Sequence, residues 1–434
     1  MLQRIKDSLL QLIRLLRESE LRNIAILSGG VFVGQFISIL AQPVATRLYT
    51  PSDFGILAII ISLVGMFGPS LNGQYHLSIV SAPNDKEANA LTALSIYFGL
   101  VVSGIVSIGI IIYSFISPET FAEAGLWIYV SIPIIFIGGI TNVLNSYNNR
   151  YKQYKLLASL ALYRAIASNV VKLGLGFAQI GFVGLIASSL ISILAGLKRQ
   201  SAHLRLNINL ILSTNKKELL RVLTKYKAQP LFSTPGLFVV TFSNNLIPIF
   251  ISSLYGIKEV GYYSLAMAML YLPIQLISSN VGTVYFRKAS MEKAETGSFY
   301  RSFKSTVVLL SLLSFVPFIV LYFSAETLFS FVFGIEWLRS GTFIQLLIPW
   351  YWMNFIVGTL VISLIISGNQ LTKLIIQCLF LAFSFAIYYL AKSVHLPIEK
   401  FLLYISLAFA SIYFILLYII YKTSKHKTII IDKP

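Results

Sequence analysis

Apolar runs of 18 or more residues recur along the whole chain, and they constrain the fold more than any other feature of the sequence. As a helix, such a run crosses the ~30 Å hydrocarbon core of a bilayer, so the runs predict transmembrane helices. We expect twelve, at roughly 24–46, 54–80, 91–117, 126–148, 157–178, 181–198, 230–254, 261–286, 305–323, 341–367, 371–391 and 399–421.

The composition excludes a soluble enzyme. Only 12% of the 434 residues are charged, whereas a soluble chain carries about 25%. The net charge of +18 does not indicate a nucleic-acid-binding protein, because the charges lie in short segments between apolar runs. That placement is the pattern of membrane topology.

The distribution of Lys and Arg predicts how the chain is oriented in the membrane. With a cytoplasmic N-terminus, the inner segments hold 27 of the 34 basic residues and the outer loops hold five. Short cytoplasmic loops collect basic residues, so this imbalance favours twelve helices with both termini in the cytoplasm. Charged residues interrupt the first apolar stretch at 14–20, and we therefore expect no secretory signal peptide.

The few cysteines and histidines do not form a metal or disulfide framework. The single cysteine, Cys378, lies in an apolar run, and the four histidines are scattered without ligand spacing. We therefore predict no metal site and no cofactor.

An internal repeat relates the two halves of the chain. LYTPSDFG at 48–55 matches LYGIKEVG at 254–261 after a shift of 206 residues. Because six is an even number, both halves enter the membrane in the same direction and form a parallel repeat, which is typical of alternating-access transporters. We predict an all-α membrane protein with two six-helix lobes, an N-lobe at 1–206 and a C-lobe at 207–434. Each lobe begins with an amphipathic segment, 2–17 or 215–227, that is an interfacial helix or a simple cytoplasmic anchor.

Charged residues inside the predicted spans point to an anionic ligand. None of the sixteen acidic residues falls within a span, whereas Arg164 and Lys172 both lie in the fifth one, with Ser168 between them on the same helical face. Intramembrane cations usually face a cavity on a substrate path, and cations without an acidic partner suit phosphate or a carboxylate sugar. The alternative is that both side chains snorkel to the membrane surface.

Polar residues near the ends of other predicted helices are further candidates for substrate contacts. Asn72 and Gln74 end the second span, and Asn280 lies in the eighth. Their amides suit sugar hydroxyls, although helix–helix hydrogen bonding explains such residues equally well. Arg287, at the inner end of the eighth helix, is a candidate contact for an entering head group or an ordinary topology anchor.

Three motifs resemble those of a known family. The segments RLYTPSDFGILA at 47–58, NRYKQYKLLA at 149–158 and GFVGLIAS at 181–188 are similar to segments of the polysaccharide biosynthesis, Wzx-type flippases. The resemblance covers essentially the full length. It implies a fold related to the multidrug exporters (MATE-like) of the same superfamily.

The resemblance also implies a function. Such flippases move a polyprenyl-pyrophosphate-linked oligosaccharide repeat unit to the outer leaflet of the bacterial cytoplasmic membrane, where it serves O-antigen, capsule or exopolysaccharide assembly. The expected partners are this glycolipid, membrane lipids and other polysaccharide-assembly proteins, and we expect a monomer. A multidrug or small-molecule exporter of the same fold is the alternative, although a proton-coupled cation exporter generally needs an intramembrane acid.

Overall fold

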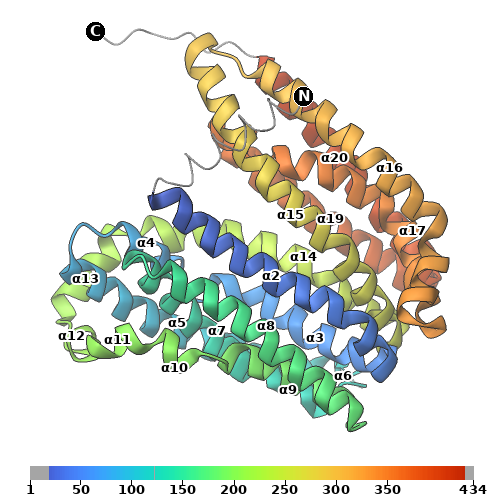
Figure 1. Ribbon diagram of the computed structural model, residues 1–434, viewed down its shortest axis with the longest axis horizontal. Helices are drawn as coiled ribbons and strands as arrows, with labels where there is room; N and C mark the ends of the chain where they lie inside the picture. Colours follow the sequence, from blue (N-terminus) through green and yellow to red (C-terminus); the bar gives the residue numbers. More distant parts are fainter. Residues whose placement is uncertain (1–18, 122, 426–434) are drawn as a thin grey trace, which may run out of the picture. The chain divides into compact units, whose positions relative to one another are not determined.

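The computed structural model describes residues 19–121 and 123–425, and every regular element within these ranges is helical (Figure 1). The predicted amphipathic segment 2–17 lies outside the described residues. The described elements are α2 (Ser19–Leu48), α3 (Pro51–Phe67), η1 (Gly68–Ser70), α4 (Tyr75–Ser81), α5 (Asp85–Ile116), α6 (Pro118–Phe121), η2 (Gly125–Val130), α7 (Ser131–Arg150), α8 (Tyr154–Phe177), α9 (Phe182–Leu194), α10 (Leu197–Gln200), α11 (Ala202–Leu206), α12 (Ile208–Leu212), α13 (Lys216–Lys225), η3 (Gln229–Ser233), α14 (Thr234–Tyr255), α15 (Ile257–Thr296), α16 (Tyr300–Phe333), η4 (Ile335–Trp337), α17 (Leu338–Met353), η5 (Asn354–Gly358), α18 (Ser363–Ile366), α19 (Gln370–Val394) and α20 (Ile398–Lys425).

Eleven helices in the described part of the chain are long and apolar enough to cross a membrane, and they coincide with eleven of the twelve predicted spans. The twelfth predicted span, 261–286, lies within α15, a 40-residue helix that is not among the eleven. Large apolar side chains cover the outside of these helices: Phe115, Phe323 and Phe331 are each at least 77% exposed. Exposed phenylalanines on long helices are suited to contact with lipid, so the chain is a multi-pass membrane protein.

Two predicted spans are interrupted in the structure. The span predicted at 54–80 ends as an α-helix at Phe67, passes through η1 and a turn, and resumes as α4. Pro69 opens the break, and Gly73 and Gln74 hold positive φ angles of 56° and 58° in the turn. The span predicted at 341–367 likewise changes from α17 to the π-helix η5 and then to the short α18.

The chain packs into two compact units. Unit 1 contains the described residues of Met1–Tyr49 together with Leu63–Pro118 and Leu126–Phe238. Unit 2 contains Thr50–Ser62, the described residues of Glu119–Gly125, and the described residues from Val239 onward. The units thus differ from the predicted lobes, because 207–238 packs with unit 1 and the start of α3 packs with unit 2. The lobes as moving bodies stay a prediction.

In unit 1, α8 lies between α2 and α9, and α5 packs against α4 and α7 (Figure 1). Helix α5 begins at Asp85, six residues before the predicted start, because the Asn84 side chain caps it by accepting a hydrogen bond from the Glu87 backbone N–H at 2.9 Å. In unit 2, α17 packs against α15, α16 and α20.

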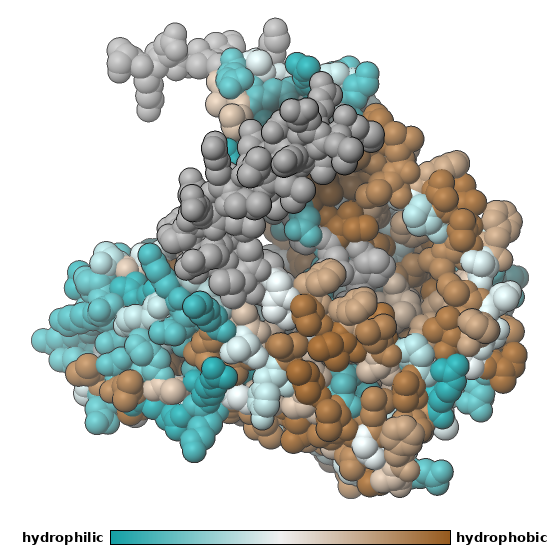
Figure 2. All heavy atoms as spheres, viewed as in Figure 1, coloured by the Kyte–Doolittle hydropathy of each residue, from teal (hydrophilic) through white to brown (hydrophobic). Residues whose placement is uncertain are grey.

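Helix α13 packs against α5 within unit 1. Its Val222 is buried in an apolar cluster that includes Leu91 of α5, and both Lys225 and Tyr226 hydrogen-bond to the buried carboxylate of Glu87. Figure 2 shows polar residues gathered at the end of unit 1 where α11–α13 lie. The bond to Glu87 raises the pKa of Lys225, and burial raises the pKa of Tyr226.

The internal repeat is preserved in the structure in register. Helices α3 and α15 begin at Pro51 and Ile257, which are 206 residues apart. The hydroxyls of Tyr49 and Tyr255, also 206 apart, each donate to a backbone carbonyl, that of Lys172 at 2.6 Å and that of Leu396 at 2.9 Å. The accepting carbonyls themselves are not 206 residues apart: Lys172 lies within α8, whereas Leu396 follows the end of α19.

Helices α3 and α15 meet inside unit 2 at two repeat-related glycines. A Cβ on Gly55 would overlap the backbone carbonyl of Ile257, and a Cβ on Gly261 would overlap the carbonyl of Pro51. Gly55 and Gly261 are 206 residues apart, and so are Pro51 and Ile257, so the internal repeat maps one contact onto the other. The close approach requires glycine at both positions.

Candidate functional site

The two predicted intramembrane cations lie on α8 in unit 1, two turns apart on one side of the helix. The Arg164 guanidinium is held in place by two hydrogen bonds: Nε donates to the Ala195 carbonyl at 3.1 Å, and Nη2 donates to Gln200 Oε1 at 2.6 Å. Gln200 is fully buried and donates onward to Asn145 Oδ1 at 2.7 Å. Arg164 therefore joins α8 to α10 and α7, with N–H groups left over for a ligand.

Lys172 is partly buried, and its side chain is not engaged by the described part of the protein. No hydrogen bond or ion pair in residues 19–121 and 123–425 uses its ammonium, and the same holds for hydrogen bonds of the Ser168 hydroxyl. The ion pairs among these residues do not include Arg164 either. Two cations within one span thus lack an acidic partner, an arrangement that an anion would stabilise.

The structure places Asn72 and Gln74 in packing roles within unit 1. Asn72 is buried, donates to the Ser95 carbonyl of α5 at 2.9 Å, and accepts from Asn142 of α7 at 3.4 Å. Gln74 is also buried and donates to the Pro69 carbonyl at 2.9 Å, which closes the turn between η1 and α4. These contacts are the helix–helix bonds of the alternative interpretation, and a substrate role for either residue stays a prediction.

The remaining two candidates, Asn280 and Arg287, belong to α15 in unit 2. Both side chains are exposed. Helix α8 belongs to unit 1 and α15 to unit 2, so neither unit contains both these residues and the α8 cations. Their substrate role is untested.

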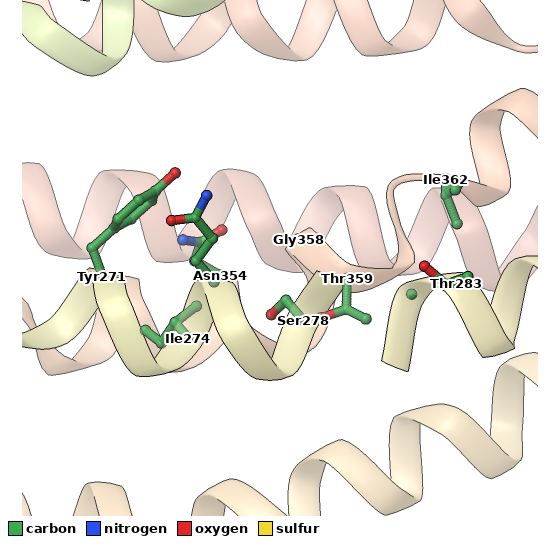
Figure 3. Close-up of a pocket in the computed structure, with 10 residues that line it drawn as sticks. Tyr271, Ile274, Ser278, Thr283, Asn354, Gly358, Thr359 and Ile362 are labelled. Atoms are coloured by element: carbon green, nitrogen blue, oxygen red, sulfur yellow. The ribbon is translucent and has the colours of Figure 1, made fainter. Parts of the chain in front are cut away.

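The sequence analysis missed a cavity in unit 2 that polar and apolar side chains line together. It has a volume of about 380 Å³ and lies between α15 and the segment formed by η5 and the residues after it (Figure 3). Ten residues line it: Tyr271, Ile274, Gln275, Ser278, Gly282, Thr283, Asn354, Gly358, Thr359 and Ile362. Two amides and three aliphatic hydroxyls meet there, and none of the ten is charged.

One signal in the sequence points to this cavity. On α15, Tyr271, Gln275 and Ser278 follow the spacing of a single helical face, so polar side chains line one side of this part of the helix. The other wall carries no such signal, because η5 is a π-helix and its irregular hydrogen bonding is not visible in the residue pattern.

A family model described as polysaccharide biosynthesis protein matches residues 44–341. No curated protein gives a significant sequence match. Among solved structures, an inward-facing multidrug resistance MATE family transporter of the MOP superfamily aligns with a TM-score of 0.63 and 14% identity, covering 94% of this chain and 100% of that one.

Two further structures give the same result. The lipid II flippase MurJ in an inward closed conformation aligns with a TM-score of 0.66 and 13% identity, over 92% of this chain and 87% of that one. An outward-facing MATE family transporter aligns with a TM-score of 0.52 and 15% identity, over 95% and 97%. The fold predicted from the sequence, a MATE-like membrane fold, is therefore confirmed, whereas the exact count of twelve spans is not.

Proposed function

The chain belongs to the polysaccharide biosynthesis protein family, and from this we propose that it is a flippase for a lipid-linked oligosaccharide. Its cargo is a polyprenyl-pyrophosphate-linked repeat unit, moved from the inner to the outer leaflet of the bacterial cytoplasmic membrane for surface polysaccharide assembly. A fold shared with a lipid II flippase supports a lipid-linked cargo.

The observation that carries the proposal is the pair of α8 cations without an acidic partner among the described residues. A pyrophosphate–sugar head group cannot cross ~30 Å of hydrocarbon unaided. Arg164 is held by Gln200, and the Lys172 ammonium makes no hydrogen bond or ion pair within the described residues, so the two side chains offer compensating positive charge within the span. Lys172 binds the phosphate groups directly, and Arg164 uses the donors that Ala195 and Gln200 leave free.

Transport follows from the repeat. Two lobes, predicted at 1–206 and 207–434, rock against one another and expose the head group first to one side and then to the other, while the lipid chain stays in the bilayer. The partners of the flippase, besides its cargo, are membrane lipids and other polysaccharide-assembly proteins. No bond of the cargo is made or broken in this cycle.

A multidrug exporter is the second candidate, because MATE transporters share the fold. Proton-coupled export of cations generally uses an intramembrane carboxylate. The buried carboxylate described at a helix start, Glu87, is already engaged by Lys225 and Tyr226. The observations therefore favour an anionic cargo.

Deleting the gene in its host, followed by analysis of lipid-linked glycans and surface polysaccharide, tests the proposal. We expect polyprenyl-linked repeat units to accumulate and the surface polymer to disappear, and the accumulated lipid identifies the cargo. Normal glycans together with altered drug sensitivity would replace the flippase with the exporter.

A further inference from the structure

We propose that the unit 2 cavity between α15 and η5 binds uncharged sugar rings of the transported glycan. The ligand class rests on the proposed function, but sugar binding is measurable without transport. The cavity is lined by uncharged residues of 271–283 and 354–362, whereas the α8 cations are Arg164 and Lys172.

The lining offers hydrogen bonds without charge. Gln275 and Asn354 each provide an amide with donors and acceptors, and no hydrogen bond within the described residues uses either amide. The Ser278 hydroxyl is buried and has no hydrogen-bond partner there. A buried polar group without a partner costs free energy, and a sugar hydroxyl would satisfy it as donor or acceptor.

Thr359 contributes a hydrogen-bond acceptor to the lining. It is buried, and its hydroxyl donates to the Phe355 carbonyl at 2.8 Å, so the oxygen is left to accept a hydrogen bond from a ligand. Ile274 and Ile362 supply apolar surface for the C–H faces of a ring, and the half-exposed Tyr271 places an aromatic face beside them. Alternating hydroxyl and C–H surface is the chemistry of a carbohydrate.

The size of the cavity also suits this ligand. Its volume of about 380 Å³ lies near the lower end of the roughly 300–1,000 Å³ found for ligand sites. That space accommodates one or two sugar rings. A smaller cavity of about 130 Å³ in the same unit, lined by residues such as Leu270, Leu313 and Phe318, is apolar, so a hydroxyl-rich lining is not a general property of unit 2.

The position of Asn354 depends on Gly358. The two residues are the first and last of the π-helix η5, and π-helical turns often occur at functional sites. A Cβ on Gly358 would lie 2.6 Å from Asn354 Oδ1, closer than real Cβ contacts allow. A side chain at 358 would therefore push the amide out of its place. Figure 3 shows Asn354 beside Tyr271 and Thr359 beside Ser278.

Ligand-observed NMR on the purified full chain in nanodiscs tests the inference, with uncharged mono- and disaccharides as probes and glucuronic acid as the charged comparison. We expect an uncharged disaccharide to bind, and Asn354→Ala and Ser278→Val each to weaken binding by about tenfold, as loss of one or two hydrogen bonds predicts. Gly358→Ala should also weaken disaccharide binding, because the new methyl group displaces the Asn354 amide.

Asn245→Ala is the matched control, because Asn245 of α14 is a partly buried amide in unit 2 that donates to its own helix at 2.8 Å and does not line the cavity. It should bind the disaccharide as the unchanged chain does. Three results would overturn the inference: no binding of any uncharged probe, equal binding by the Asn354 and Asn245 variants, or stronger binding of glucuronic acid.

A flipping assay separates this inference from the proposed function. The probe is a defined polyprenyl-pyrophosphate disaccharide in phosphatidylglycerol–phosphatidylethanolamine vesicles. Sugar binding that depends on Asn354, without flipping by the unchanged chain, supports the cavity and contradicts the flippase. Flipping that is the same for the unchanged chain and Asn354→Ala supports the flippase and contradicts the cavity.

Discussion

At the scale of single residues, the ammonium of Lys172 provides the sharpest test of the flippase. We expect Lys172→Glu to reduce flipping by at least about a hundredfold, because it replaces attraction for a pyrophosphate with repulsion at membrane depth. Lys172→Arg keeps the charge and should retain most activity. Transport of the defined lipid-linked disaccharide into the outer leaflet of vesicles measures the effect.

The control is Lys155→Glu, which makes the same change at an exposed position in the first turn of the same helix. It should flip lipid as the unchanged chain does. Normal transport by Lys172→Glu would leave Lys172 as a snorkelling residue without a role in cargo binding.

The sequence predicted the α8 cations because their charge is unusual in an apolar helix, whatever the rest of the chain does. It did not predict the bond from Arg164 to Gln200, since these residues meet only when α8 and α10 pack together. The sequence also did not predict that Asn72 and Gln74 bond within unit 1, because amide groups serve helix packing and sugar binding alike. Residue type thus identifies a charge, but only packing identifies its partner.

At the scale of elements, the crossing of α3 and α15 predicts a matched pair of mutants. Gly55→Ala and Gly261→Ala should each destabilise the protein by about 1–3 kcal/mol, because the new methyl group overlaps a helix carbonyl that has little room to move. The two effects should be similar and less than additive, since either change already separates the helices.

Thermal unfolding in detergent, followed by tryptophan fluorescence, measures both variants and the double variant. Gly104→Ala is the control, because nothing lies within 4 Å of a Cβ at that position of α5. Independent, fully additive losses would mean that the two glycines do not share one crossing.

The buried and exposed sides of helix α13 should respond differently to the same substitution. Val222→Asp should release the helix from unit 1, because an unpaired charge in the apolar cluster is strongly unfavourable. Leu220→Asp is the matched control, since Leu220 is 52% exposed. Hydrogen exchange of the 216–225 amides should accelerate only in the Val222 variant; acceleration in both variants would mean that α13 is held mainly by the membrane.

The bond to Glu87 gives the same helix a pH dependence. Because it raises the pKa of Lys225 above its unfolded value, its contribution is fully present below the ordinary lysine pKa and is lost as pH rises through the folded-state value. The same bond lowers the pKa of Glu87, so its contribution is also lost when that carboxylate is protonated at acidic pH. Docking of α13 should therefore persist through neutral pH and weaken under both strongly alkaline and acidic conditions.

The elements also show where hydropathy stops being informative. Length and apolar character predicted the positions of eleven spans, because the bilayer sets both. They did not predict the break after Phe67 or the π-helix at Asn354–Gly358. Side chains bond to backbone carbonyls at both places, Gln74 to that of Pro69 and Thr359 to that of Phe355, and hydropathy does not register such contacts. The unit 2 cavity is built at such a break, which explains why the sequence analysis missed it.

At the scale of the whole molecule, the predicted orientation rests on the basic residues and on an even number of spans. The unconfirmed helix is the eighth, within α15. If 261–286 did not cross the membrane, every loop after it would change sides. The repeat argues that it does cross, because α15 begins in register with α3, the helix that begins the second span.

Accessibility of single cysteines decides between these topologies. Cys378 is first replaced by Ala, and cysteines are then placed at three exposed lysines, Lys216, Lys258 and Lys373. With twelve spans, a membrane-impermeant maleimide added to intact cells should label only Lys258→Cys, and the other two should react after the membrane is opened. Labelling of Lys373→Cys in intact cells would mean that α15 does not span. The C-terminus would then lie outside, and the two halves would no longer form the parallel repeat that alternating access requires.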